Sequence, residues 1–240
     1  MDTVALLAFG LLAGLLGGIV GTGSSLVMMP LLTALYGPRQ AIPIMAIAAI
    51  LGNFGRVLAW RREIAWRSCG AYCVTAIPGA MIGARLLLAI PPGVAEAALG
   101  VFFLALIPLR HWLAKHALRI TPAQLMLLGA PLGVLTGVVA TTGPLTVPLF
   151  TMHGLERGAF LGTEAAASIG MYVAKVATFQ ALGALPPQVV AQGLGVGATL
   201  MAGSFAARFV VLRLPGGTYR WLIDAVMLCS GTALLWMALR

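Results

Sequence analysis

Two stretches of this chain set glycines, hydroxyl side chains and prolines inside long apolar runs, a combination that could bind an anion. The first, GGIVGTGSSLVMMP, covers Gly17 to Pro30, and the second, GVLTGVVATTGPLTVPLFT, covers Gly133 to Thr151. An unpaired backbone group in hydrocarbon costs several kcal/mol, so irregular backbone at membrane depth is tolerated only where it lines a cavity or is buried in protein. The two stretches are therefore candidate helix breaks beside a binding site.

A half-helix that begins at such a break points free N–H groups and its positive dipole end into the cavity, which suits an anion. Nearby hydroxyls could cap these helices or contact a ligand, and glycines let a ligand approach the backbone closely. The predicted substrate contacts at the breaks are Gly21, Thr22, Gly23, Ser24, Ser25, Thr141, Thr142 and Gly143. The structural alternative is that the glycines pack helices together and the hydroxyls bond to their own helix.

Two cations inside apolar segments are the second candidate feature. Arg56 lies in NFGRVLAW and Lys175 in MYVAKVATF, 119 residues apart. An intramembrane cation needs a partner, a cavity or a route by which its head reaches the interface. The segment of Arg56 holds no acid, so an anionic substrate could supply the missing charge. Asn53 is a candidate neutral hydrogen-bonding group of the same cavity, and snorkelling to the interface is the alternative for both cations.

Glu164 is the only acid well inside its apolar segment. It shares a helix face with Ser168 and Lys175, but a helix separates Glu164 from Lys175 by about 16 Å, too far for a direct pair. Two interpretations remain open. Glu164 couples proton movement to transport, or it pairs with Arg157 across a distorted helix start.

The elements that must position these residues are membrane segments. The chain has 240 residues, of which 60% are hydrophobic and 9% charged, whereas a soluble domain has about 25% charged residues. Apolar runs lie at roughly 3–36, 41–60, 68–90, 93–109, 121–152, 158–182, 187–212 and 218–239. Since a span needs about 20 residues, the first and fifth runs are too long for one span and too short for two. We expect an all-α polytopic membrane protein with about eight segments and broken or re-entrant first and fifth segments.

The two halves of the chain resemble each other. Matched positions, at offsets between 118 and 123 residues, are Gly14 with Gly133, Gly18 with Gly137, Pro30 with Pro148, Arg39 with Arg157, and Ala84–Arg85 with Ala207–Arg208. The order of the matches is preserved, which indicates an internal duplication. We predict one membrane transport domain over residues 1–240, with repeat halves at about 1–110 and 121–240 joined by a basic loop at 110–121.

Loop charges favour inverted halves. Lysine and arginine accumulate on the cytoplasmic side of a membrane protein. If all eight segments were simple spans, the loop cations would divide 7 to 4 between the two sides. If the first and fifth segments are hairpins that enter and leave on one side, the division is 9 to 2, with both termini outside. The nine are Arg61, Arg62, Arg67, Arg110, Lys115, Arg119, Arg157, Arg213 and Arg220, against Arg39 and Arg240.

Glycine and proline patterns link the chain to a known family. GGIVGTGSSLVMMP resembles the start of the TauE/SafE family of sulfite-exporter-like permeases, and GARLLLAIPP resembles the third segment of that family. The resemblance covers essentially the whole chain. It departs from the family pattern where Ser24 and Ser25 replace a common further glycine, and where ATTGP replaces a glycine cluster in the second half.

The resemblance implies transport of a small sulfur-containing anion, organosulfonate or related carboxylate across the cell membrane, here by alternating access between two halves. Expected partners are the anion and membrane lipid, with a homodimer left open; no nucleic acid, cofactor or metal is expected. The expected location is the bacterial inner membrane. An anion channel of the same architecture is the alternative. An intramembrane enzyme built on Ser24 or Ser25 is a further one, although the three histidines lie at or near loops, which leaves Lys175 as its base.

Overall fold

Helices make up every regular element that the structure describes. The structure is a computed structural model that describes residues 3–21, 23–115, 119–139 and 142–211, together with residues 225, 228–229, 231–233 and 235–236. The helices are α1 (Thr3–Val20), α2 (Gly23–Tyr36), α3 (Pro38–Trp60), α4 (Trp66–Ala89), α5 (Pro92–Lys115), α6 (Pro122–Val138), α7 (Gly143–Met152), α8 (Arg157–Ala181) and α9 (Pro187–Val211). The all-α prediction is confirmed. Most of the eighth predicted segment, 218–239, lies outside the described residues.

The first and fifth apolar runs are each divided into two helices. α1 ends at Val20 and α2 begins at Gly23, while α6 ends at Val138 and α7 begins at Gly143. Gly21 adopts a left-handed backbone with φ of 87°, which residues with a Cβ rarely adopt. The predicted breaks therefore occur, and they fall within the glycine- and hydroxyl-rich stretches.

Close contacts at glycines fix the direction of the helices on one side of the bundle. A Cβ at Gly193 would lie 2.7 Å from Ile47, and one at Gly197 would lie 2.6 Å from Leu51, so α3 and α9 run parallel. Along α1, Gly14 lies against Leu200 and Gly18 against Ala207, so α1 also runs parallel to α9. α1 and α3 therefore share one direction, and α2 must return between them.

The other side of the bundle runs in the opposite direction. Gly79 of α4 lies against Ala130 of α6, and Gly83 lies against Val134, so these two helices are parallel. α8 runs antiparallel to α3, because its first turns at Gly158 and Gly162 lie against Trp60 at the end of α3. Gly162 and Gly170 of α8 lie against Ile64 and Ile77, so α8 runs parallel to α4. α6 and α8 therefore share a direction opposite to that of α1 and α3, and α7 must return between them.

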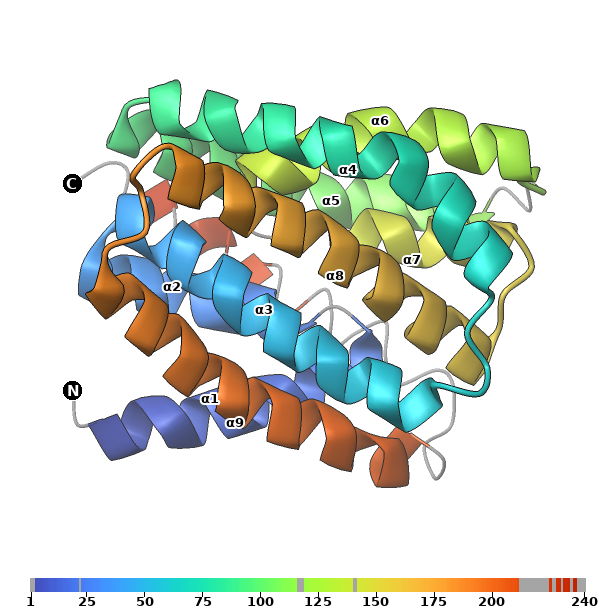
Figure 1. The fold of residues 1–240 in the computed structure, drawn as a ribbon, viewed down its shortest axis with the longest axis horizontal. Coiled ribbons are helices and arrows are strands. Elements are labelled where there is room, and N and C mark those ends of the chain that lie inside the picture. Colours follow the sequence, from blue (N-terminus) through green and yellow to red (C-terminus); the bar gives the residue numbers. More distant parts are fainter. Residues whose placement is uncertain are drawn as a thin grey trace.

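Each broken run is consequently a hairpin whose two ends lie at the same end of the bundle. The N–H of Ile120, just before α6, donates to the Met152 carbonyl at the end of α7 over 3.1 Å. Figure 1 shows the α1–α2 hairpin at the end of the bundle that carries the N-terminus, and the α6–α7 hairpin entering from the opposite end. Gly21 at the first break lies against Phe160 and Leu161 in the first turns of α8, and Val139 at the second break is bonded by Lys175 in the second half of α8.

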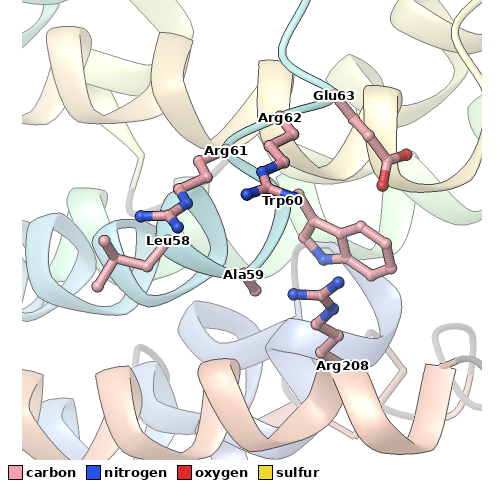
Figure 2. Close-up of a pocket in the computed structure, with 7 residues that line it drawn as sticks. All are labelled: Leu58, Ala59, Trp60, Arg61, Arg62, Glu63 and Arg208. Carbon is pink, nitrogen blue, oxygen red and sulfur yellow. The ribbon is translucent and has the colours of Figure 1, made fainter.

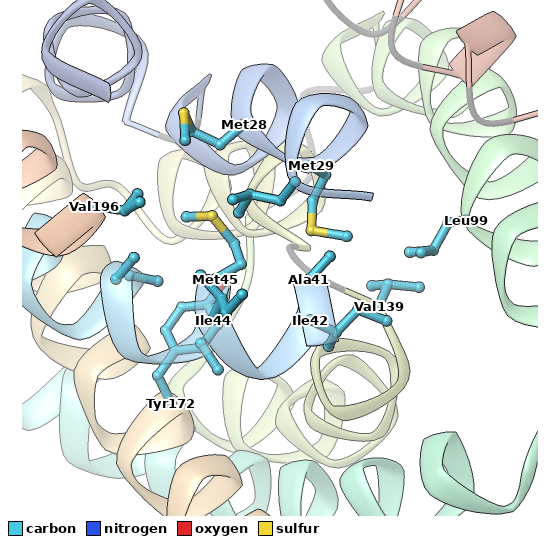
Figure 3. Close-up of a cluster of buried hydrophobic side chains, with 14 of the residues drawn as sticks. Met28, Met29, Ala41, Ile42, Ile44, Met45, Leu99, Val139, Tyr172 and Val196 are labelled. Carbon is cyan, nitrogen blue, oxygen red and sulfur yellow. The ribbon is translucent and has the colours of Figure 1, made fainter. Parts of the chain in front are cut away.

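A hydrophobic cluster fills the space around α2 and α3. Met28 and Met29 of α2 meet Ile44 and Met45 of α3, and Tyr172 of α8 closes the cluster from the other side (Figure 3). These α2 and α3 side chains are fully buried. Methionine side chains are flexible and can fill the irregular space beside a broken helix. The cluster therefore packs α2 against α3 a few residues after the first break.

Three described helices are long and apolar enough to cross a membrane, namely Arg39–Trp60, Trp66–Ala89 and Pro187–Val210. Shorter apolar helices accompany them, including both members of the first hairpin. Large apolar side chains such as Leu127 and Phe209, 73% and 65% exposed, lie on the outer surface. In a bilayer this surface would contact lipid tails, so the bundle fits a hydrocarbon environment.

Basic side chains gather at one end of the bundle. Arg61, Arg62 and Arg67 are exposed around the turn between α3 and α4, and Arg119 is exposed just before α6. These positions lie at the end from which the α6–α7 hairpin enters. Arg39 is exposed at the opposite end, at the start of α3. The bundle is therefore strongly asymmetric in charge along its long axis.

Candidate functional site

A buried ion pair joins the two groups of helices. The Arg56 guanidinium of α3 lies 2.8 Å from Glu164 Oε2 of α8, and the two side chains are 8% and 4% exposed. Arg56 and Glu164 meet because α3 and α8 run antiparallel, which brings the last turns of α3 beside the first turns of α8. A desolvated pair of this kind is held strongly, because losing one partner leaves an uncompensated buried charge.

Arg56 also binds the first helix break. Its guanidinium donates to the carbonyl oxygen of Gly21, at the end of α1, and to Oδ1 of Asn53, one turn earlier on α3. The segment of Arg56 holds no acid, as the sequence showed, but Glu164 supplies a fixed counterion from a segment 108 residues away in sequence. Asn53 lies beside Arg56 as predicted, and both are buried.

Glu164 extends the same network to the second break. Its Oε1 accepts hydrogen bonds from the hydroxyls of Ser168, over 2.8 Å, and Thr146, over 3.3 Å. The same Thr146 hydroxyl lies 3.1 Å from the carbonyl of Gly143, the first residue of α7, so its single proton is shared between this carbonyl and the Glu164 carboxylate. One buried chain of polar contacts therefore runs from Gly21 through Arg56 and Glu164 to Gly143. Glu164 thus has Arg56 as its ion-pair partner, while the side chain of Arg157, the partner considered from the sequence, lies outside the described residues.

Lys175 binds the end of the helix that precedes the second break. Its ammonium donates to the carbonyls of Thr136 and Val139, each over 2.9 Å, and lies 5.7 Å from the ring centre of Phe179. Lys175 is fully buried. The last carbonyls of a helix have no partner within the helix and carry its negative dipole end, so a cation is stabilised there.

The two cations thus play similar parts at the two breaks. Arg56 binds the carbonyl that follows α1, and Lys175 binds the carbonyls that end α6. Neither contact was expected, since the sequence argument placed both cations beside helix N-termini. A cation at the carbonyl end of one half-helix lies close to the N-terminus of the next, because the two ends meet at the same break.

The remaining predicted contacts lie at the breaks in different ways. Ser25 is buried, whereas Ser24 is partly exposed and lies against Gly17. Gly23 and Gly143 begin α2 and α7. Thr142 precedes α7 without capping it, since its hydroxyl is bonded to that of Thr136. Thr22 and Thr141 lie outside the described residues.

Several glycines pack helices together, as the structural alternative proposed. Added Cβ atoms at Gly14 and Gly18 would lie 2.6 and 2.5 Å from α9. Gly133 and Gly137 allow α6 a similarly close approach to α4. The glycines at the breaks differ, because Gly21 is required by its φ of 87°. Glycine content alone could not separate these two uses.

Thr136 and Thr146 are site residues that the sequence argument missed. Both are buried, and they bond to Thr142 and Glu164 respectively. Their signal was present, since each is a hydroxyl residue within six positions of the second break. Ser168 was noted only for its place on the Glu164 face, and the structure brings it to the carboxylate.

Chemically, the network contains two cations that a bound anion could contact in addition to their present partners. Arg56 and Lys175 are buried within an apolar bundle, beside the starts of two helices and several hydroxyls. An anion that entered between the breaks would compete with Glu164 for the Arg56 guanidinium, which favours planar, charge-assisted contacts. The arrangement suits binding and release of an oxyanion.

Comparison with known proteins identifies the family of the chain. Searches of curated proteins and of solved structures gave no match. The family model described as "Sulfite exporter TauE/SafE" matches residues 6–234, which include both helix breaks and all the site residues named above. The chain, an integral membrane protein by its apolar helices, therefore belongs to the sulfite exporter TauE/SafE family of membrane transporters.

Proposed function

We propose that this protein carries a small sulfur-containing oxyanion or organosulfonate, such as sulfite, across the membrane by alternating access. The observation that carries the proposal is the buried polar chain from Gly21 through the Arg56–Glu164 pair to Gly143. It links two helix breaks deep inside an apolar bundle. Irregular backbone and charge at such a depth are typical of a substrate path.

The two halves, about 1–110 and 121–240, are inverted copies in this proposal and together form one transport domain. Contacts at matched positions support it. Gly18 lies against Ala207, and Gly137 against Ala84, so glycines 119 residues apart pack on alanines 123 residues apart. The opposite directions of α1 and α6 agree with inversion. Halves of this kind place their helix breaks near the membrane midplane and can rock about a central site.

In the described conformation Glu164 occupies the guanidinium of Arg56. The substrate anion would displace this carboxylate, or bind once Glu164 takes up a proton, so Glu164 is the candidate coupling group. Binding contacts would come from Asn53, the hydroxyls of Ser24, Ser25 and Thr142, and the backbone at Gly23 and Gly143. Thr22 and Thr141, predicted from the sequence, belong to the same proposed set.

Lys175 would contribute charge while holding the end of α6. Its ammonium is bonded to the Thr136 and Val139 carbonyls. It would therefore attract the anion from a distance by its charge, or give up one of these carbonyl hydrogen bonds to bind the anion directly. The membrane potential would favour anion exit, by about 2.3 kcal/mol per charge per 100 mV.

The orientation follows from charge. The end with Arg61, Arg62, Arg67 and Arg119 would face the cytoplasm of a bacterial inner membrane. The start of α1 would then face outward, and the loop charges predict the same side for the C-terminus. Anionic lipid at that face and the substrate are the proposed partners.

Anion-dependent thermal stabilisation of the purified protein tests the binding step. Sulfite, thiosulfate, sulfate, a small sulfonate, acetate and chloride are compared at equal ionic strength. We expect selective stabilisation by a sulfur oxyanion or sulfonate, lost in Arg56→Gln and kept in Arg67→Gln, an exposed cation of equal charge. Equal responses to all anions, or none, would contradict the proposal.

A further inference from the structure

A pocket at the basic end of the bundle is separate from the central polar network. Its volume is about 290 Å³, and it is lined by Leu58, Ala59, Trp60, Arg61, Arg62, Glu63 and Arg208. Figure 2 shows Arg208 extending from α9 toward the indole of Trp60, while Arg61 and Arg62 come from the end of α3. The pocket thus lies where α9 passes the end of α3.

The charge of this pocket is strongly unbalanced. Three arginines line it with a single acid, Glu63. The Glu63 carboxylate lies against Gly158 in the first turn of α8, where the positive end of the helix favours a negative charge. Among the described residues, the only ion pair found is that of Arg56 with Glu164. The three guanidinium groups therefore keep a net positive charge around the pocket.

The position of one arginine is fixed by an aromatic ring. The Arg208 guanidinium lies 5.4 Å from the ring centre of Trp60, and Trp60 itself is only 6% exposed. Stacking on an aromatic face orients a guanidinium and leaves its edge free for planar hydrogen bonds. Two or three guanidinium groups around a small cavity match the oxygens of a tetrahedral anion better than they match a spherical halide.

We propose that this pocket is a second anion site, which binds an oxyanion of the sulfate, sulfonate or phosphate class at the basic end of the bundle. Trp60 forms its inner wall. It follows Arg56 by about one turn of α3 and packs against Gly158 and Gly162 of α8. None of the residues that line the pocket belongs to the Arg56–Glu164 network, so the pocket is distinct from the central network.

The same chemistry has two sources in a cell. A free oxyanion can enter from solution, and the phosphate of an anionic lipid headgroup can reach an end of the bundle from the membrane. Both would be held by the same guanidinium groups. The experiment therefore needs an arm for each source.

Trp60 provides a local reporter. Protein labelled with 5-fluorotryptophan is examined by fluorine NMR, and the Trp60 resonance is assigned as the one lost in Trp60→Phe. Sodium sulfate and sodium phosphate are titrated against sodium chloride at equal ionic strength, in zwitterionic-lipid nanodiscs. A parallel sample in phosphatidylglycerol nanodiscs tests the headgroup. If a free oxyanion binds, the Trp60 resonance should shift saturably during the titration in zwitterionic-lipid nanodiscs. If a lipid headgroup binds, the resonance in phosphatidylglycerol nanodiscs should differ from that in zwitterionic-lipid nanodiscs before any anion is added.

Matched variants locate the effect. Arg62→Gln leaves the Arg208–Trp60 contact in place and should weaken the apparent affinity about tenfold, the loss expected for one charge-assisted contact. Arg67→Gln removes an equal charge at the same end, outside the pocket, and should bind normally. Arg56→Gln should also bind normally here, even where central binding is lost. A Trp60 resonance that responds to oxyanions, lipid and chloride alike, or equally in Arg62→Gln and Arg67→Gln, would overturn the proposal.

Discussion

At the scale of single residues, the Arg56–Glu164 pair decides how charge is held inside the bundle. Either Arg56→Gln or Glu164→Gln alone leaves one buried charge without its partner. We expect each single variant to lower the free energy of unfolding by about 3–5 kcal/mol. The double variant should lose clearly less than the sum of the two, because neither charge remains. Thermal unfolding of the four proteins in one detergent measures this coupling.

The control for this cycle is Glu156→Gln, which removes an exposed carboxylate just before α8. It should change stability little, alone or with Arg56→Gln. Additive losses for Arg56 and Glu164 would mean that the two side chains do not interact.

The sequence identified both members of this pair but not the pairing. Arg56, Lys175, Asn53 and Glu164 were all marked by charge or polarity within apolar segments. Their partners depend on how α3, α6 and α8 pack, and contacts such as Lys175 with Val139 join residues 36 positions apart. Such contacts follow from tertiary packing, and no local spacing encodes them.

At the scale of elements, the break between α1 and α2 depends on Gly21. Its φ of 87° is strained for any residue with a Cβ, and a Cβ there would lie 3.1 Å from Leu161 and 3.3 Å from Phe160. We expect Gly21→Ala to cost about 1–2 kcal/mol in backbone strain, with a further loss from crowding, and to weaken anion binding. Thermal unfolding and the anion panel measure both effects.

Gly183→Ala is the matched control, since Gly183 has φ of 69° with open space around it. It should show the strain alone and leave anion stabilisation unchanged. If Gly21→Ala behaved no differently from Gly183→Ala, the break would not position the site.

The breaks themselves were predictable from sequence, because run length and glycine, proline and hydroxyl content all pointed to the same stretches. The use of each glycine was not. Gly14 and Gly137 pack against neighbouring helices, whereas Gly21 turns the chain, and the three look alike in sequence. Only the neighbouring helix and the backbone angle separate these uses.

At the scale of the whole molecule, the charge asymmetry predicts an orientation in the membrane that cysteine labelling can test. In a background without native cysteines, Gln40→Cys and Ala123→Cys place exposed thiols at opposite ends of the bundle. With the basic end in the cytoplasm, a membrane-impermeant thiol reagent added to intact cells should label position 40 and spare position 123. After the membrane is permeabilised, both should react, which controls for accessibility. The reverse pattern would contradict the proposed orientation.

The predicted repeat and membrane orientation could be inferred from sequence patterns, whereas individual side-chain contacts could not. The proposed duplication rests on matched residues at offsets of 118 to 123 positions, and the loop cations add a signal for orientation. The position of the Arg208–Trp60 pocket left no such trace, because it forms where α9 passes the end of α3, about 148 residues later in the chain.

Counterflow in proteoliposomes tests the central claim, that a sulfur oxyanion or sulfonate is carried through the linked breaks. Vesicles are loaded with unlabelled sulfite, or in parallel with a small sulfonate, and diluted into a trace of the ³⁵S-labelled form. Alternating access predicts that label rises transiently above its equilibrium level, that the uptake saturates, and that Arg56→Gln abolishes it while Arg67→Gln does not. Label that only equilibrates, or fails to enter with either compound, would contradict the account.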